Sequence, residues 1–144
     1  QFLLREVGWI KPDVPPKKYP YASFTGGAEL VSASVESTDS RTWTLVLQWH
    51  AMGPVTAQIF VHVRDSTGNL VAQADGAALG GLIPAWVWEA GDRLYDVRTI
   101  HVPPGAAPPY SVQVGLHNSE GRLPAWIKGI RASEDAVPVV RFGK

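Results

Sequence analysis

Cysteine is missing from all 144 residues of the sequence. This absence excludes disulfide bonds, thiolate metal ligands and thiol redox chemistry, but it does not assign a compartment, since exported domains can also lack cysteine. A net charge is missing too, because lysine plus arginine and aspartate plus glutamate each total 13. Without a broad positive field, we expect no nucleic-acid partner and no direct attraction to an anionic membrane surface.

Long apolar runs are also absent. No run approaches the roughly 18 residues of a membrane span, and the first residues lack the basic region and apolar core of a signal peptide. Because the sequence starts with Gln1, we interpret it as a processed chain or as a domain of a longer protein, and we expect membrane attachment only through a parent chain outside this sequence. A hydrophobic content of 45% is enough for one domain with its own core.

No window repeats its apolar residues at helical spacing, and several short segments alternate apolar and polar residues instead. In the strongest of these segments the larger side chains share one face: Trp43, Leu45, Leu47 and Trp49. Weaker alternation predicts further strands at 31–35, 58–64, 98–102 and 110–117. With 14 glycines and 12 prolines between them, these segments predict an all-β antiparallel β-sandwich, immunoglobulin-like or jelly-roll, with about seven to nine strands and almost no helix.

Two similar segments, 61–72 and 114–125, are predicted to be hairpins. Asp65 or Asn118 would cap the turn through its side chain, and Gly68 or Gly121 would supply a left-handed residue. Hairpin chemistry explains the similarity better than internal duplication does. Residues 1–24, which are rich in proline, are expected to form an N-terminal segment and linker, and residues 25–144 the sandwich domain.

Motifs for catalysis or metal binding are not found. The histidines at 50, 62, 101 and 117 lack the spacing of a helical metal site, and neither a GxSxG motif nor a phosphate-binding loop is present. We therefore assign no catalytic residue, no metal ligand and no cofactor. The one cation that we consider is Ca²⁺, held by Asp65, Asn69 or the loop at Asp75, although turn formation explains these residues equally simply.

The long segment between residues 74 and 91 interrupts the strand pattern and carries four nearby carboxylates: Asp75, Glu89, Asp92 and Asp96. A pair of them could act on a glycosidic bond, but Asp75 before Gly76 and Asp92 after Gly91 are also typical turn residues, which is the interpretation we favour. Long loops in small domains are often functional. A glycoside hydrolase is nevertheless the weakest of our functional hypotheses.

Six tryptophans are the main anomaly of the composition. Trp86 and Trp126 lie in near-copies of one segment, Ile83-Pro-Ala-Trp-Val87 and Leu123-Pro-Ala-Trp-Ile127. Each ring could stack on a sugar or anchor a protein interface, or it could plug an open end of the sandwich. We favour the plug because burial of an indole is worth a few kcal/mol. Together with Trp88, Asp75 and Asp92, these two tryptophans are our candidate ligand-binding residues.

The order of the short motifs between residues 24 and 142 resembles a known family. The motifs are FVHVRDSTGNLVAQADG, WEAGD, VPPG, YSVQVGLH and EGRLP. They are similar to the soluble carboxyl-terminal sandwich of bacterial multi-span membrane proteins of the glycosyltransferase type, such as dolichyl-phosphate-mannose mannosyltransferases. The sequence departs from that pattern at residues 77–83, which are apolar here and polar in the family.

The resemblance implies a non-catalytic accessory domain that is extracytoplasmic, membrane-associated as part of a membrane-anchored protein, and in contact with carbohydrate, either a glycan or a lipid-linked sugar. The alternative is a structural or protein–protein assembly module in which the apolar 77–88 loop packs against another chain. Exposure separates these hypotheses. An exposed Trp86 in a groove with Asp75 or Asp92 favours sugar binding, whereas a flat apolar patch favours assembly.

Overall fold

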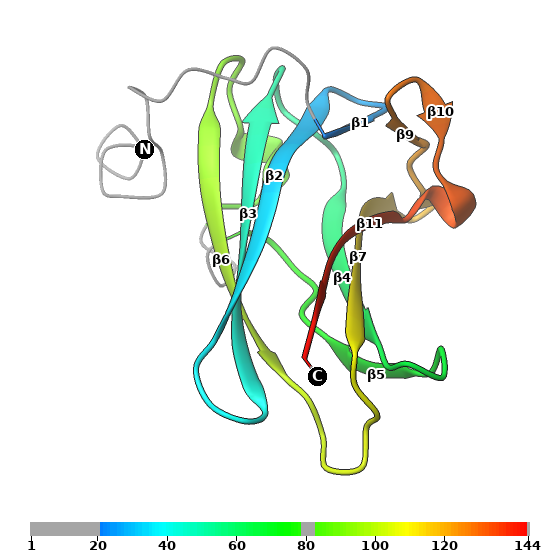
Figure 1. Cartoon of the computed structure of the whole chain (residues 1–144). Helices are drawn as coiled ribbons and strands as arrows, with labels where there is room; N and C mark the ends of the chain where they lie inside the picture. Colours follow the sequence, from blue (N-terminus) through cyan, green and yellow to red (C-terminus); the bar gives the residue numbers. More distant parts are fainter. Residues whose placement is uncertain (1–20, 79–82, 144) are drawn as a thin grey trace.

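A computed structural model describes residues 21–78 and 83–143, and within them eleven strands form two antiparallel sheets that pack face to face (Figure 1). Sheet A has the order β10 (Ile130–Arg131), β9 (Ala125–Ile127), β1 (Ala22–Phe24), β2 (Ala28–Ser37), β3 (Thr42–Ala51) and β6 (Arg93–His101). Sheet B has the order β11 (Val137–Phe142), β7 (Tyr110–Asn118), β4 (Gln58–Arg64) and β5 (Leu70–Gln73), and β8 (Gly121–Arg122) pairs with β7. The prediction of an all-β antiparallel sandwich is confirmed.

Helical structure is confined, in the part of the chain that is described, to two single turns of 3₁₀ helix, η1 (Ala85–Val87) and η2 (Ser133–Asp135). None of the described helices is long and apolar enough to cross a membrane. The strand number exceeds the expected seven to nine because β8, β9 and β10 are only two or three residues long. Strands of that length carry too little alternation to be recognised in a sequence.

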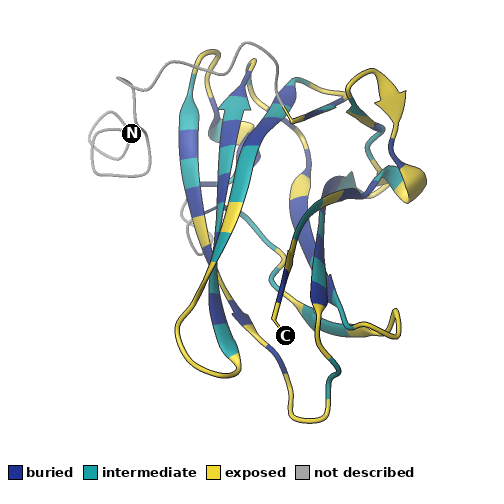
Figure 2. Cartoon of the chain, in the orientation of Figure 1, coloured by how far each residue is buried: buried dark blue, intermediate teal, exposed yellow. Residues whose placement is uncertain are grey.

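The core lies between the two sheets and is built by alternation, which Figure 2 shows along the strands. In β3 all four predicted core residues are buried, Trp43, Leu45, Leu47 and Trp49, and Ala51 continues the same face. The Trp49 ring packs 5.7 Å from Phe24 and 5.9 Å from Trp88, measured between ring centroids. Each buried aromatic ring removes about 150–250 Å² from water, or about 4–6 kcal/mol of transfer free energy.

A β-bulge at Val31 changes the predicted pattern of β2. Leu30 pairs with Trp49 and Ser32 with Gln48, so Val31 is the extra residue. Leu30 and Val31 are both buried, although they are adjacent. The bulge explains why these two neighbours are both buried, because an extra residue shifts the alternation by one position.

Both predicted hairpins are confirmed. Asp65 Oδ1 accepts hydrogen bonds from the Thr67 and Asn69 amides, at 2.9 and 3.2 Å, in the turn between β4 and β5. Asn118 Oδ1 accepts one from the Glu120 amide at 2.8 Å between β7 and β8. Gly68 takes the expected positive φ of 90°, a backbone conformation in which a residue with a side chain would be strained.

The first strand begins before the boundary expected at residue 25. Ala22 and Phe24 in β1 are buried, and β1 pairs with β2 on one side and β9 on the other. Most of the expected N-terminal segment, residues 1–20, lies outside the described residues. The sandwich therefore includes residues 22–24. The sequence did not predict this strand because it is short and follows a proline-rich stretch.

A buried ion pair joins β6 of sheet A to the chain that follows β5 of sheet B. Asp96 is 0% exposed and accepts from Arg98 Nη2 at 2.9 Å and from Trp49 Nε1 at 3.2 Å. Arg98 also donates to the carbonyl oxygens of Ala74 and Gly76 at 2.6 and 2.8 Å. The predicted start of this strand at residue 98 is wrong, since β6 begins at Arg93 and its inward positions at 96 and 98 are charged.

Candidate functional site

Trp86 lies on the surface, in the middle of η1. Its side chain is 56% exposed, whereas the preceding Ala85 is 3% exposed and accepts a hydrogen bond from the Val55 amide at 3.0 Å. The prediction that Pro-Ala-Trp plugs the sandwich with its indole is wrong. In both Pro-Ala-Trp sequences the alanine, Ala85 or Ala125, is buried, and the tryptophan that follows it is exposed.

A groove of about 430 Å³ adjoins Trp86. The other lining residues are mainly polar and come from the start of β4 and the end of β7: Thr56, Ala57, Gln58, His117, Asn118 and Ser119. Gln58 and His117 are cross-strand partners, so the register of β4 and β7 places their side chains next to each other. The groove thus combines one flat aromatic ring with several hydrogen-bonding groups, a composition typical of ligand sites.

A second groove of about 330 Å³ shares His117 and Asn118 with the first. Its other lining residues are Phe60, His62, Asp75, Gly121 and Arg122. Trp86 and Asp75 therefore line two adjoining grooves and do not share one, which differs from the single groove that the sugar-binding hypothesis predicted. The grooves extend over the outer face of sheet B.

Phe60 forms the floor of the second groove. Its side chain faces outward, as the alternation predicts, yet it is only 3% exposed. A methyl group at Gly115 would lie 2.2 Å from Phe60 Cζ, so the ring lies directly against the glycine backbone. The guanidinium carbon of Arg122 lies 4.4 Å from the ring centroid on the outer face of sheet B. This cation–π contact helps to hold both side chains in place.

The Asp75 side chain makes a structural hydrogen bond and also lines the second groove. Its Oδ1 accepts a hydrogen bond from the Val61 amide at 2.7 Å, which fixes the chain after β5 against β4. Its Oδ2 accepts from Gln73 Nε2 at 3.3 Å and lies 3.8 Å from His62 Nε2. Burial lowers the pKa of His62 below its ordinary value of 6.5, and the Asp75 carboxylate opposes this change. The imidazole is thus held mainly neutral at physiological pH.

Two of the predicted binding residues lie elsewhere. Trp88 is 0% exposed and packs against Trp49 in the core, which corrects its assignment as a ligand contact. Asp92 accepts a hydrogen bond from the Glu89 amide at 2.9 Å, as expected of a turn residue. Neither residue lines the two grooves.

Trp126, the fifth candidate, is 37% exposed but belongs to β9 of sheet A. Its ring centroid lies 5.4 Å from the guanidinium carbon of Arg131, which in turn pairs with Asp135. The two similar Pro-Ala-Trp segments therefore place their rings in different settings, one in η1 and one on a strand of sheet A. Trp126 does not line either groove.

The described part of the apolar 77–88 loop faces inward. Ala78, Ile83, Ala85 and Trp88 are all buried in this chain's own core, and Ala78 forms an isolated bridge with Ile83. Residues 79–82 lie outside the described residues. Trp86 is thus the one large apolar side chain that the described part of the loop exposes to more than half of its area.

The polar groups considered for catalysis or cation binding have structural partners. Asp96 is buried with Arg98, and Asp65 is bonded within its own turn. Among the described residues, no group of three or more histidine or acidic side chains is placed to hold a metal ion. Thr56, Gln58 and Arg122 also line the grooves but had no signal in the sequence, and Asn118 had only that of a turn residue. Only the strand register places these residues together.

Comparison with protein-family models and with curated proteins finds no match to this chain. The resemblance in short motifs accordingly remains a hypothesis about its family. The functional assignment rests on the residues that line the grooves and on their chemistry.

Proposed function

We propose that this protein is a non-catalytic carbohydrate-contacting domain whose ligand lies over the outer face of sheet B, with Trp86 as the principal stacking residue. The observation that carries the proposal is the 56% exposure of Trp86 beside a groove lined by Gln58, His117 and Asn118. An indole left in water forgoes burial worth a few kcal/mol, so its exposure beside a groove that also holds hydrogen-bonding side chains favours a ligand contact.

The chemistry of the grooves suits a sugar ring. The flat apolar face of the indole can pack against the C–H face of a sugar, and the surrounding side chains can exchange hydrogen bonds with its hydroxyl groups. Gln58 and Asn118 each offer both a donor and an acceptor, and Asp75 offers an acceptor in the second groove. Because the two grooves adjoin, the proposed ligand is longer than one sugar ring.

The resemblance in short motifs suggests where the domain acts and to which kind of protein it belongs. We propose that the domain acts on the extracytoplasmic side as an accessory part of a membrane glycosyltransferase-like protein. There it would hold a glycan or the sugar of a lipid-linked donor while transfer takes place in another part of that protein. The inward packing of the described 77–88 loop gives less support to the alternative of an assembly surface.

Replacement of the stacking residue tests the proposal. Wild-type protein should first be screened against an oligosaccharide array, and the best ligands titrated by calorimetry. Trp86→Ala should weaken binding at least about tenfold, since loss of a stacking aromatic costs more than about 1.4 kcal/mol. Its urea midpoint should stay close to wild type, because the removed side chain is largely exposed.

The matched control is Trp126→Ala, which removes an exposed tryptophan from sheet A. This variant should bind as the wild type does. Equal losses in the two variants, or no binding of any oligosaccharide by the wild type, would contradict the proposed site.

A further inference from the structure

The outer face of sheet B extends beyond the two grooves. On β4 the outward residues are Gln58, Phe60, His62 and Arg64, and their respective partners on β7 are His117, Gly115, Gln113 and Ser111. The pair of Arg64 and Ser111 lies six residues along β4 from Gln58, a distance of about 20 Å at the rise of a β-strand. The face therefore continues in one direction from the Trp86 groove to Arg64.

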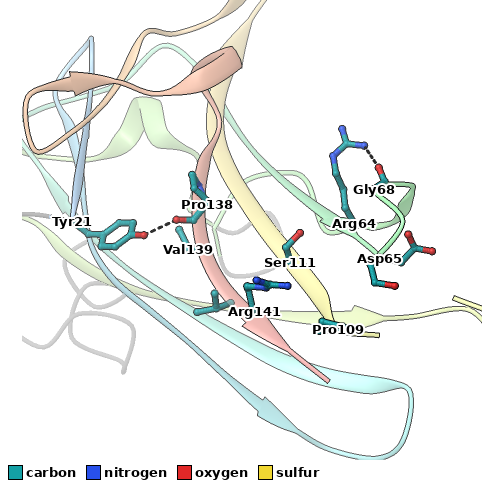
Figure 3. A pocket seen from close by; sticks show the side chains of 11 residues that line it. Tyr21, Arg64, Asp65, Gly68, Pro109, Ser111, Pro138, Val139 and Arg141 are labelled. Atoms are coloured by element: carbon teal, nitrogen blue, oxygen red, sulfur yellow. Dashed lines mark hydrogen bonds between the residues drawn. The ribbon is translucent and has the colours of Figure 1, made fainter. Parts of the chain in front are cut away.

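At that end, two arginines flank a serine in one row across three strands. Arg64 on β4 and Arg141 on β11 both pair in register with Ser111 on β7. Together they line a hollow of about 550 Å³, which Figure 3 shows from close by. One side of the hollow is held in place by Tyr21, whose hydroxyl donates to the Pro138 carbonyl oxygen at 2.6 Å.

The two guanidinium groups have no carboxylate partner in the described part of the chain. Arg64 donates to two neutral acceptors, Gln113 Oε1 at 3.2 Å and the Gly68 carbonyl oxygen at 3.1 Å. The Arg141 side chain makes no hydrogen bond or ion pair with any described residue. The two arginines start from backbone positions about 10 Å apart on either side of β7, so this end of the face carries two positive charges.

Asp65 is the acidic residue that also lines this hollow. Its Oδ1 already accepts hydrogen bonds from the Thr67 hydroxyl and amide, at 2.6 and 2.9 Å, and from the Asn69 amide. In Figure 3 its carboxylate points away from Arg141. Its charge is therefore engaged by its own turn, which leaves the positive charge of the row available to a ligand.

We infer that Arg64, Ser111 and Arg141 form a subsite for an anionic group of the glycan, a carboxylate or a sulfate. The Arg141 guanidinium can present parallel N–H donors to two oxygens of such a group, and Arg64 adds its charge and the N–H donors that Gln113 and Gly68 do not use. The Ser111 hydroxyl supplies another donor. The ligand class is then an acidic oligosaccharide that stacks on Trp86 and extends along β4 and β7. This inference rests on the proposed function and adds the charge of the ligand to it.

Matched pairs of neutral and acidic oligosaccharides test the inference. We would titrate oligogalacturonates and their methyl esters, and a sulfated galactan fragment and its desulfated form, by calorimetry. One of the acidic forms should bind wild type about tenfold more tightly than its neutral counterpart, and rising salt should reduce that preference. Arg64→Gln/Arg141→Gln should remove the preference and leave the affinity for the neutral form unchanged.

The control variant Arg41→Gln/Lys128→Gln removes the same charge from exposed loops outside sheet B and should keep the preference. Equal affinity of wild type for the acidic and neutral forms in both pairs overturns the inference and leaves the proposed function standing. If binding of the acidic oligosaccharide is lost in Arg64→Gln/Arg141→Gln but unchanged in Trp86→Ala, the proposed role of Trp86 is overturned instead. If the protein binds phosphatidylglycerol vesicles but none of the acidic oligosaccharides, the inference that the anionic group belongs to a glycan is overturned.

Discussion

Replacement of Arg98 by methionine should be the most destabilising single change at the junction of the two sheets. The side chain is 7% exposed and its partner Asp96 is 0% exposed. Methionine fills a similar volume but leaves the Asp96 carboxylate buried without its cation. It also removes the donors for the carbonyl oxygens of Ala74 and Gly76.

The expected loss follows from these contacts. Removal of one partner of a buried ion pair costs about 3–5 kcal/mol, because the remaining charge stays out of water. This is a large fraction of the stability of a small domain, about 5–15 kcal/mol. The double variant Asp96→Asn/Arg98→Met has no buried charge and retains an acceptor for Trp49 Nε1. It should lose only about 1–3 kcal/mol, the value of the two hydrogen bonds to carbonyl oxygens.

Urea unfolding followed by tryptophan fluorescence measures both variants, with the slope of the transition compared to exclude a change in the unfolded state. Arg131→Met is the matched control, because Arg131 is 51% exposed in its pair with Asp135 and its loss should cost less than about 1 kcal/mol. If Arg98→Met lost no more than this control, or if the double variant were no more stable than Arg98→Met, the account of the pair would be refuted.

Two further predictions concern the second groove. Gly115→Ala should lower the unfolding free energy by about 1–3 kcal/mol, since its methyl group would lie 2.2 Å from Phe60 Cζ; urea unfolding with a wild-type midpoint would contradict the contact. Because burial lowers the pKa of folded His62, the unfolded chain binds the proton more readily, and stability is lost as pH falls below about 6.5. His62→Gln should therefore show a smaller drop in urea midpoint between about pH 7.5 and about pH 5.5 than the wild type; an equal drop would contradict this assignment.

The fold class could be predicted because alternation in β3, β4 and β7 is strong and their turns have clear chemistry. Other features had no such signal. The bulge at Val31 is a local change of register that the alternation of a single strand does not reveal. The inward positions Asp96 and Arg98 look like solvent-facing residues in the sequence, because only the folded structure shows that they neutralise each other.

The candidate site was predictable only in part. The two Pro-Ala-Trp segments are nearly identical in sequence, yet Trp86 lies within a 3₁₀ turn beside sheet B and Trp126 belongs to a strand of sheet A. Trp88 could not be separated from Trp86 because both rings occur in one irregular loop. The polar residues that line the grooves come from strands far apart in sequence, so their proximity depends on the pairing of β4 with β7.

The position of β1 between β2 and β9 has a practical consequence for truncation. Its three residues are the link between the first and last parts of sheet A. A chain that began at Thr25 would lose this link and leave the backbone donors and acceptors of β2 and β9 unpaired along two new strand edges. Such edges can pair with another copy of the chain, so the shortened domain should aggregate more readily than one beginning at Tyr21.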